Sequence, residues 1–253
     1  RAARGRRESG LVVQALGAGG LVVGTTVWAL GAPVPAAVPW WTSFLLLTIA
    51  GERLELVRLV RPTRAILRAA ALLVAALGLA SALFPLWPGP ASRALGATWL
   101  AAAAWLLRFD LARRSVRRPG LPRFMAVCLL SGYAWLATAG ALALTLGLPP
   151  AGPHYDAVLH AFLLGFVFAL LFGHAPVVFP AVLGVPIPFR TRFYAHLALL
   201  HAGVLLRLAG DLAAAPSWRA TGGLLNALAI LVFLASTAAA AWGGRARRPT
   251  QRA

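Results

Sequence analysis

The sequence is poor in charge, in acidic residues and in cysteine. Only 12% of its 253 residues are charged, whereas 60% are hydrophobic, and the mean hydropathy is +0.78. This balance excludes a disordered chain and argues against a soluble globular domain. The single cysteine, Cys128, excludes an internal disulfide framework. An integral membrane protein is the class that fits such a composition.

Motifs of several familiar enzyme classes are also missing. The chain has no Cys-x-x-Cys-His for covalent haem, no glycine-rich phosphate loop with lysine, no His-Glu-x-x-His zinc motif and no nucleophile elbow. These absences argue against a hydrolase of the soluble type. Whether the chain is an enzyme stays open at this point.

Long apolar runs predict membrane-spanning helices, because about 20 helical residues cross the hydrocarbon core of a bilayer. Eight runs have about this length. They lie at roughly residues 11–30, 36–57, 65–86, 93–111, 123–147, 156–179, 193–213 and 219–242. The sequence therefore predicts an all-α fold, a polytopic integral membrane helical bundle that forms one transmembrane domain over residues 1–253.

The arginines alternate between successive loops. Loops on one side hold the arginines within residues 1–7, 58–64, 113–118, 190–192 and 245–252. The opposite loops hold little beyond Arg93 and Arg219. The positive-inside rule then predicts that both termini are cytoplasmic, in a bacterial-type inner membrane, and an even number of spans agrees with this. We also expect the first run to be an uncleaved anchor rather than a signal peptide, because the later spans need a cytoplasmic start.

The net charge of +18 could in principle indicate nucleic acid as a partner. Its confinement to alternate loops instead favours membrane lipid, since arginines beside a bilayer are attracted to anionic headgroups. We therefore expect no nucleic-acid partner.

The second predicted span carries carboxylates near its cytoplasmic end. Thr48, Glu52 and Glu55 share one helical face, because steps of three and four residues return to the same stripe. Glu52 and Glu55 could form a carboxylate pair inside the bundle and relay protons. Alternatively, both acids could pair at the interface with arginines of the same segment, which are Arg53, Arg58 and Arg61.

Histidines stand out in the sixth and seventh predicted spans. His160 and His174 are fourteen residues apart, so regular α-helical winding predicts that they project from nearly one face, roughly 21 Å apart. The seventh span contributes His196 and His201. Because the two spans run antiparallel, His174 and His196 should lie at a similar depth near the cytoplasmic side. His196 and His201 are about 140° apart around their helix, so only one of them can face the sixth span.

Imidazoles that face each other from neighbouring helices typically bind haem iron, and they also bind copper or zinc. His174 and His196 are the preferred pair, with His201 as a replacement or an additional ligand. The fourteen-residue spacing partly resembles the cytochrome b bundle, although the second helix does not repeat it. The alternative is that these histidines only form hydrogen bonds in a polar interface.

A second polar group is predicted near the opposite side of the membrane. Asp156 and His160 begin the sixth span, while Arg207 and Asp211, four residues apart and able to pair, end the seventh. These four residues should lie at one level. They could form the proton-linked pathway of a metal-free transporter or a quinone-binding membrane subunit, because ionisable residues inside a bilayer usually serve a function.

The segment from Tyr155 to Asp211 also resembles a known family. His160-Ala-x-x-x-Gly165, the later Gly173-His174 and a histidine-rich next span are similar to NnrS-type haem- and copper-associated membrane proteins, and more distantly to subunit I of haem-copper oxidases. The resemblance implies haem b or copper as cofactor, with His160 and His174 as ligands. It further implies electron transfer or nitric-oxide handling, together with other respiratory membrane subunits. The chain has fewer spans and fewer histidines than an oxidase catalytic subunit, which argues against oxygen reduction by this chain alone.

Overall fold

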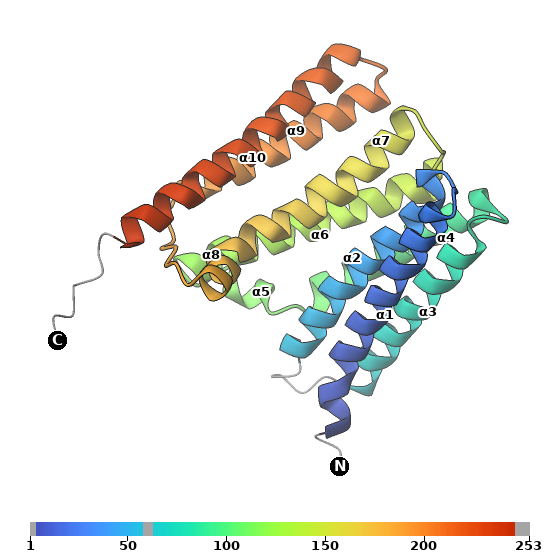
Figure 1. Cartoon of the computed structure of the whole chain (residues 1–253), viewed down its shortest axis with the longest axis horizontal. Helices are drawn as coiled ribbons and strands as arrows, with labels where there is room; N and C mark the ends of the chain where they lie inside the picture. The colour runs from blue at the N-terminus through green and yellow to red at the C-terminus, as the bar shows by residue number, and fades with distance from the viewer. Residues whose placement is uncertain (1–3, 58–62, 246–253) are drawn as a thin grey trace. The chain divides into compact units, whose positions relative to one another are not determined.

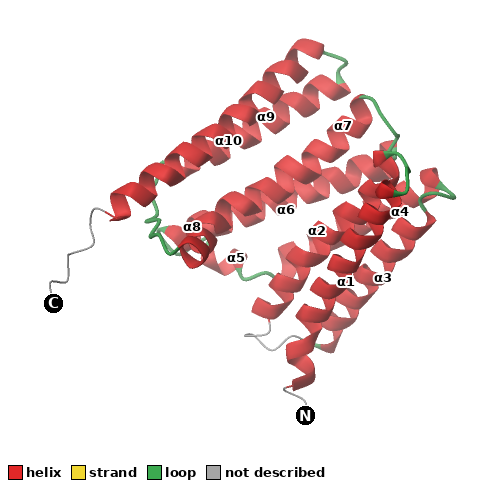
Figure 2. Ribbon diagram, viewed as in Figure 1, coloured by secondary structure: helices red, strands yellow, loops and turns green. Residues whose placement is uncertain are grey.

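The computed structural model describes residues 4–57 and 63–245, and within them the chain is helical, with loops but no strand (Figures 1 and 2). In chain order the helices are α1 (Arg4–Ala29), α2 (Val34–Val57), α3 (Arg64–Leu83), α4 (Pro88–Phe109), α5 (Ala112–Ser115), α6 (Leu121–Leu146), α7 (Pro153–His160), the π-helix η2 (Ala161–Phe168), α8 (Ala169–Leu183), α9 (Phe193–Leu212) and α10 (Pro216–Arg245). The all-α prediction is confirmed.

Seven helical segments of the described chain are long and apolar enough to cross a membrane. They are Gly10–Ala29, Val34–Leu56, Arg64–Leu83, Leu121–Leu146, Pro153–Leu183, Phe193–Leu212 and Pro216–Gly243. They coincide with seven of the eight predicted spans and identify the chain as a multi-pass membrane helical bundle. The remaining predicted span, residues 93–111, falls on α4, which has 22 residues but is less apolar. An eighth crossing stays a prediction.

The first of two compact units comprises Arg1–Leu111 and Leu136–Val158. Here α1 packs along α2 and α3 packs along α4 (Figure 1). A side chain on Gly96 of α4 would strike the backbone of α6 at Gly140 and Leu144, so the two helices touch through their main chains. The buried hydroxyls of Ser43 and Ser81 lie 3.1 Å apart and join α2 to α3. Small residues thus let apolar helices approach closely, as is usual in membranes.

The second unit comprises Ala112–Trp135 and Leu159–Ala253. Helices α9 and α10 run side by side as an antiparallel hairpin (Figure 1). Glycines bring them together, since a side chain on Gly203 would strike Asn226 and one on Gly222 would strike the backbone of Arg207. Buried aromatic side chains fill the space between this hairpin, α8 and the first half of α6.

The sixth span is not a regular α-helix. Eight residues, Ala161–Phe168, form the π-helix η2 between α7 and α8. Hydrogen bonds from residue i to i+5 wind the chain by a smaller angle per residue than an α-helix does. The α-helical calculation that put His160 and His174 on nearly one face therefore does not apply to this segment. Irregular helical turns of this kind occur often at functional sites.

Candidate functional site

His196 lies in the aromatic core of the second unit. Its side chain belongs to α9 and only 1% of the residue is exposed. Four phenyl rings surround the imidazole, with ring centroids 4.8 to 6.0 Å away: Phe172, Phe233, Phe193 and Phe124. They come from α8, α10, α9 and α6. The packing of these helices thus surrounds one polar ring with apolar side chains.

The hydrogen bonds of His196 determine which of its nitrogens carries the proton. The hydroxyl of Ser236 donates to the carbonyl oxygen of Phe233 at 3.1 Å. That oxygen of Ser236 also lies 3.3 Å from Nδ1 of His196. With the serine proton directed to the Phe233 carbonyl, it accepts a hydrogen bond from Nδ1. The neutral imidazole then has its lone pair on Nε2. Within the part of the chain that the structure describes, this buried nitrogen has no hydrogen-bond partner.

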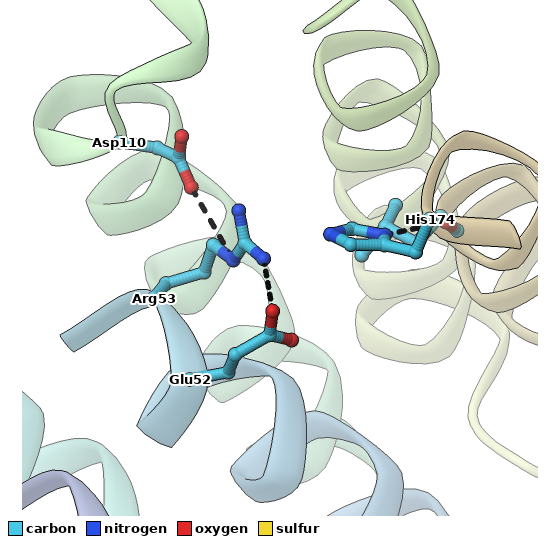
Figure 3. Close-up of polar contacts among 5 residues, drawn as sticks. Glu52, Arg53, Asp110 and His174 are labelled. Atoms are coloured by element: carbon cyan, nitrogen blue, oxygen red, sulfur yellow. Dashed lines mark hydrogen bonds and ion pairs between the residues drawn. The ribbon is translucent and has the colours of Figure 1, made fainter. Parts of the chain in front are cut away.

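His174 has the same proton arrangement but a different orientation. Its Nδ1 lies 2.6 Å from the carbonyl oxygen of Leu170, which can only accept, so Nδ1 is the donor (Figure 3). On α8, however, the residue that packs against His196 is Phe172. His174 follows it by two residues, about 200° around the helix, and therefore projects from the opposite side of α8. The predicted arrangement, in which His174 and His196 face each other, does not agree with this geometry.

His201 uses both of its ring nitrogens. Nδ1 accepts a hydrogen bond from the indole Nε1 of Trp135 at 3.0 Å, and Nε2 lies 3.0 Å from the hydroxyl of Ser131. That hydroxyl itself donates to the carbonyl of Val127 at 2.7 Å, so Nε2 carries the proton. The alternative of a hydrogen-bonding histidine thus describes His201. In this state no lone pair is available for the predicted replacement or additional metal ligand.

Asp211 is a predicted site residue of the second unit and is buried. Its side chain is 0% exposed, and Oδ1 lies 2.8 Å from Nε of Arg219 on α10. Arg219 thus forms an ion pair that the sequence did not predict. Arg207 is half-buried on α9 beside Gly222, and His160 is half-buried at the end of α7. Asp156 belongs to the first unit, so the common level of the four residues stays a prediction.

The predicted carboxylates of α2 lie in the first unit. Arg53 is buried and contacts Glu52 at 2.5 Å and Asp110 at 3.9 Å (Figure 3). The Glu52 side chain is 50% exposed, so the prediction of an interior carboxylate pair is wrong for this residue, and its pairing with Arg53 follows the interface alternative. Glu55 instead packs against Gly10 of α1. Arg58 and Arg61 lie outside the described residues.

Clusters suited to a bare metal ion are not found among the described residues. In that part of the chain no three or more histidine, cysteine, aspartate or glutamate side chains gather closely enough to hold one. A copper or zinc ion bound by protein side chains alone normally has at least three such ligands. Haem differs, because its own four nitrogens hold the iron and the protein adds one or two ligands.

Comparison with known proteins places the chain in a family. A domain of unknown function (DUF8744) matches residues 1–242. The chain belongs to the DUF8744 family. No curated protein and no solved structure matches it. The function of this DUF8744 chain therefore has to be inferred from the contacts and burial of its polar residues.

Several residues of the DUF8744 site had not been singled out from the sequence. Trp135 and Ser131 engage His201, and Ser236 orients His196. Ser131 and Trp135 are four residues apart on α6, a spacing that places both on one helical face. That spacing is a local signal, but it does not reveal which helix the face meets.

Proposed function

We propose that this DUF8744 chain is a haem-binding membrane protein and that His196 is the iron ligand. The observation that carries the proposal is the buried Nε2 of His196, whose lone pair has no partner among the described residues. Metal-binding histidines usually donate their other ring N–H to an oxygen acceptor, which sets the tautomer and the ring orientation. Ser236 provides that acceptor. A buried polar atom without a partner is costly unless a ligand uses it.

Haem fits this site better than copper. A single imidazole would leave a copper ion short of protein ligands, whereas a haem needs only one. The surrounding phenyl rings suit an apolar macrocycle and exclude water. Because four rings enclose the imidazole, several of these side chains would have to move aside for a haem to bind. Copper remains the second cofactor that the resemblance to NnrS-type proteins implies.

The roles of the protein groups follow from this arrangement. His196 would hold the iron, Ser236 would keep its ring oriented, and the phenylalanines would keep the surroundings dry. A haem with one protein ligand supplies one-electron chemistry and an open position for a diatomic molecule such as nitric oxide. We therefore propose nitric-oxide handling or electron transfer, in association with other respiratory membrane subunits.

The test is a visible spectrum of the protein purified in detergent after expression with a haem precursor. We expect a Soret band in the wild type and its loss in His196→Gln. His154→Gln is the matched control, because His154 is exposed at the start of α7. Ser236→Ala should retain haem but shift its reduction potential, since the Nδ1 proton loses its acceptor. A colourless wild type, or a Soret band that survives in His196→Gln, would refute the proposal.

We further propose that the protein resides in a bacterial-type inner membrane with both termini cytoplasmic. Eight crossings meet this requirement if α4 is included. Two surface hollows between α3 and α4 support the proposal. One is lined by Ala69, near the start of α3, and by Trp105, near the end of α4. The other is lined by Leu83, at the end of α3, and by Pro90, near the start of α4. Helix α4 thus runs antiparallel to α3 along most of its length.

A second function is favoured by the ion pair of Asp211. The Asp211 carboxylate is 0% exposed and lies at the end of a candidate span. An ionisable group inside a bilayer is energetically costly and usually serves a function. A metal-free transporter or quinone-binding subunit could use Asp211 together with Arg207 and His160 of the same unit. Proteoliposomes would test this candidate, which predicts that Asp211→Asn abolishes proton-coupled uptake in a preparation without haem or metal. Uptake that is unaffected by the substitution would exclude it.

A further inference from the structure

The surface between α3 and α4 is hollowed along most of its length. Two hollows, of about 390 and 250 Å³, adjoin each other because Ala76 and Thr98 line both. Residues with short side chains, such as Ala76 and Ala101, line the bottom of these hollows. The lining extends along α3 from Ala69 to Leu83, roughly 21 Å at 1.5 Å per residue. The two hollows therefore form one long, narrow, apolar groove.

The rim of the groove is apolar and exposed. Leu72 and Leu79 of α3 are 71% and 62% exposed and form its rim. Both helices are free of charged residues between Arg68 and Leu83 and between Arg93 and Arg108. A groove of this length and polarity matches an extended hydrocarbon chain.

One end of the groove is strongly basic. Ala69 and Trp105 line that end. Arg68 precedes Ala69 by one residue and Arg108 follows Trp105 by three, so both arginines flank this end. Arg64 adds a third guanidinium one turn away, in the first turn of α3. All three arginines are exposed, and within the described chain none has a carboxylate partner. Unpaired guanidinium groups at this position attract a phosphate.

The side chain of Trp105 lies just inside the basic end. The side chain of Trp105 lines the groove, and the residue is 7% exposed. Its indole Nε1 is buried, and among the residues described it has no hydrogen-bond partner. Trp105 is three residues, roughly 4.5 Å, deeper than Arg108. In a phospholipid the ester carbonyls lie at a comparable step below the phosphate, and they are acceptors.

We propose that the α3–α4 groove is a binding site for one anionic phospholipid of the arginine-side leaflet. Its phosphate pairs with Arg68 and Arg108, an ester carbonyl accepts from Trp105, and one acyl chain extends along the alanine floor. The positive charge at this end of the groove favours an anionic lipid over a second copy of the chain or a quinone. A helix of a second copy would bring further arginines to the same level, and a quinone has no anionic headgroup.

Native mass spectrometry of the full chain tests the proposal, with phosphatidylglycerol and phosphatidylcholine of matched acyl chains as probes. We expect the wild type to retain one phosphatidylglycerol under activation that removes phosphatidylcholine. The double variant R68Q/R108Q should weaken retention by about twenty-five-fold, because each arginine near an anionic headgroup contributes about five-fold. A97L/A101L should block the groove while leaving the fold intact, since both alanines are exposed, and should release the lipid.

Two further variants make the result specific. Arg93→Gln removes an exposed arginine from the opposite end of α4 and should leave retention unchanged. Trp105→Phe keeps an aromatic ring but removes the N–H, and it should lower retention several-fold with unchanged helix content. Equal retention of the two lipids, or wild-type retention in R68Q/R108Q or A97L/A101L, would overturn the proposal. A dimeric wild type that A97L/A101L converts to a monomer would do the same, because a second copy would then occupy the groove.

Discussion

The indole Nε1 of Trp135 donates a hydrogen bond to Nδ1 of His201 over 3.0 Å. The planes of the two rings are inclined by 29°, with centroids 6.3 Å apart. The other side of the indole packs against the bare backbone of Gly165 in the π-helix. One tryptophan therefore joins three segments of the second unit, which are α6, η2 and α9.

Removal of this hydrogen bond should destabilise the protein modestly. Trp135→Phe keeps an apolar ring on Gly165 but leaves Nδ1 of His201 without its donor. Interhelical hydrogen bonds in membrane proteins average about 0.6 kcal/mol, with a maximum near 1.7. We expect a loss in this range from equilibrium unfolding in mixed micelles of mild detergent and dodecyl sulfate. Trp218→Phe, at an exposed position, is the control, and equal losses in the two variants would contradict the assigned bond.

The close approach of Gly165 and Trp135 predicts a larger effect. A Cβ atom on Gly165 would lie 2.5 Å from Cγ of the indole, a rigid atom that cannot move aside. Gly165→Ala should therefore destabilise by about 1–3 kcal/mol through overpacking. Gly78→Ala is the matched control, because open space surrounds Gly78 in α3, and there we expect a gain of about 0.5–1 kcal/mol.

A double variant separates overpacking from other effects at Gly165. Gly165→Ala combined with Trp135→Leu should lose less stability than the sum of the two single losses, because the smaller side chain makes room for the new methyl group. Strict additivity would show that the indole does not lie on Gly165.

The ion pair of Asp211 and Arg219 predicts that the loss of either side chain lowers the free energy of unfolding by a different amount. Arg219→Gln leaves a carboxylate that is 0% exposed without this partner, and a buried polar group that loses its partner costs about 1–3 kcal/mol. Asp211→Asn should cost less, because the Arg219 side chain is 39% exposed and can reach water. Unfolding of the single variants and of the double variant D211N/R219Q measures the order. Arg93→Gln controls for the loss of an outer arginine, and an Asp211→Asn loss larger than that of Arg219→Gln would contradict the assignment.

The eight-span topology predicts where reporter fusions are active. A cytoplasm-active fluorescent fusion at either terminus should fluoresce, because eight crossings return the chain to its starting side. A phosphatase inserted near Gly152, in the loop between α6 and α7, should be active on the opposite side. If only one terminus fluoresces, α4 does not cross and the number of spans is seven.

Much of the fold could be predicted because the relevant signals are local. An apolar run of about 20 residues matches the thickness of the bilayer whatever its neighbours are, so seven spans agree with helices of the structure. The interruption of the sixth span was not predictable in the same way. A π-helix differs little in local energy from an α-helix, and its place beside Trp135 depends on a contact with α6.

The candidate site was predicted by residue type but not by geometry. The sequence drew attention to His196 and His201, since a polar ring is costly in a bilayer. It could not distinguish them, because their different proton arrangements come from Ser236, Trp135 and Ser131, which lie 40 to 70 residues away in the chain. The position of Phe172 opposite His196 similarly depends on the rotation of α8 about its axis.

The amino-acid sequence by itself determined that this protein is a helical membrane bundle and that its apolar segments carry few polar residues. Both follow from the free energy of transferring each segment into hydrocarbon, which depends on composition alone. The tertiary structure decided which imidazole keeps a lone pair, which acid has an arginine partner and which helix face is hollowed. These properties depend on the atoms that other helices bring within hydrogen-bond distance, and transfer energies carry no information about them.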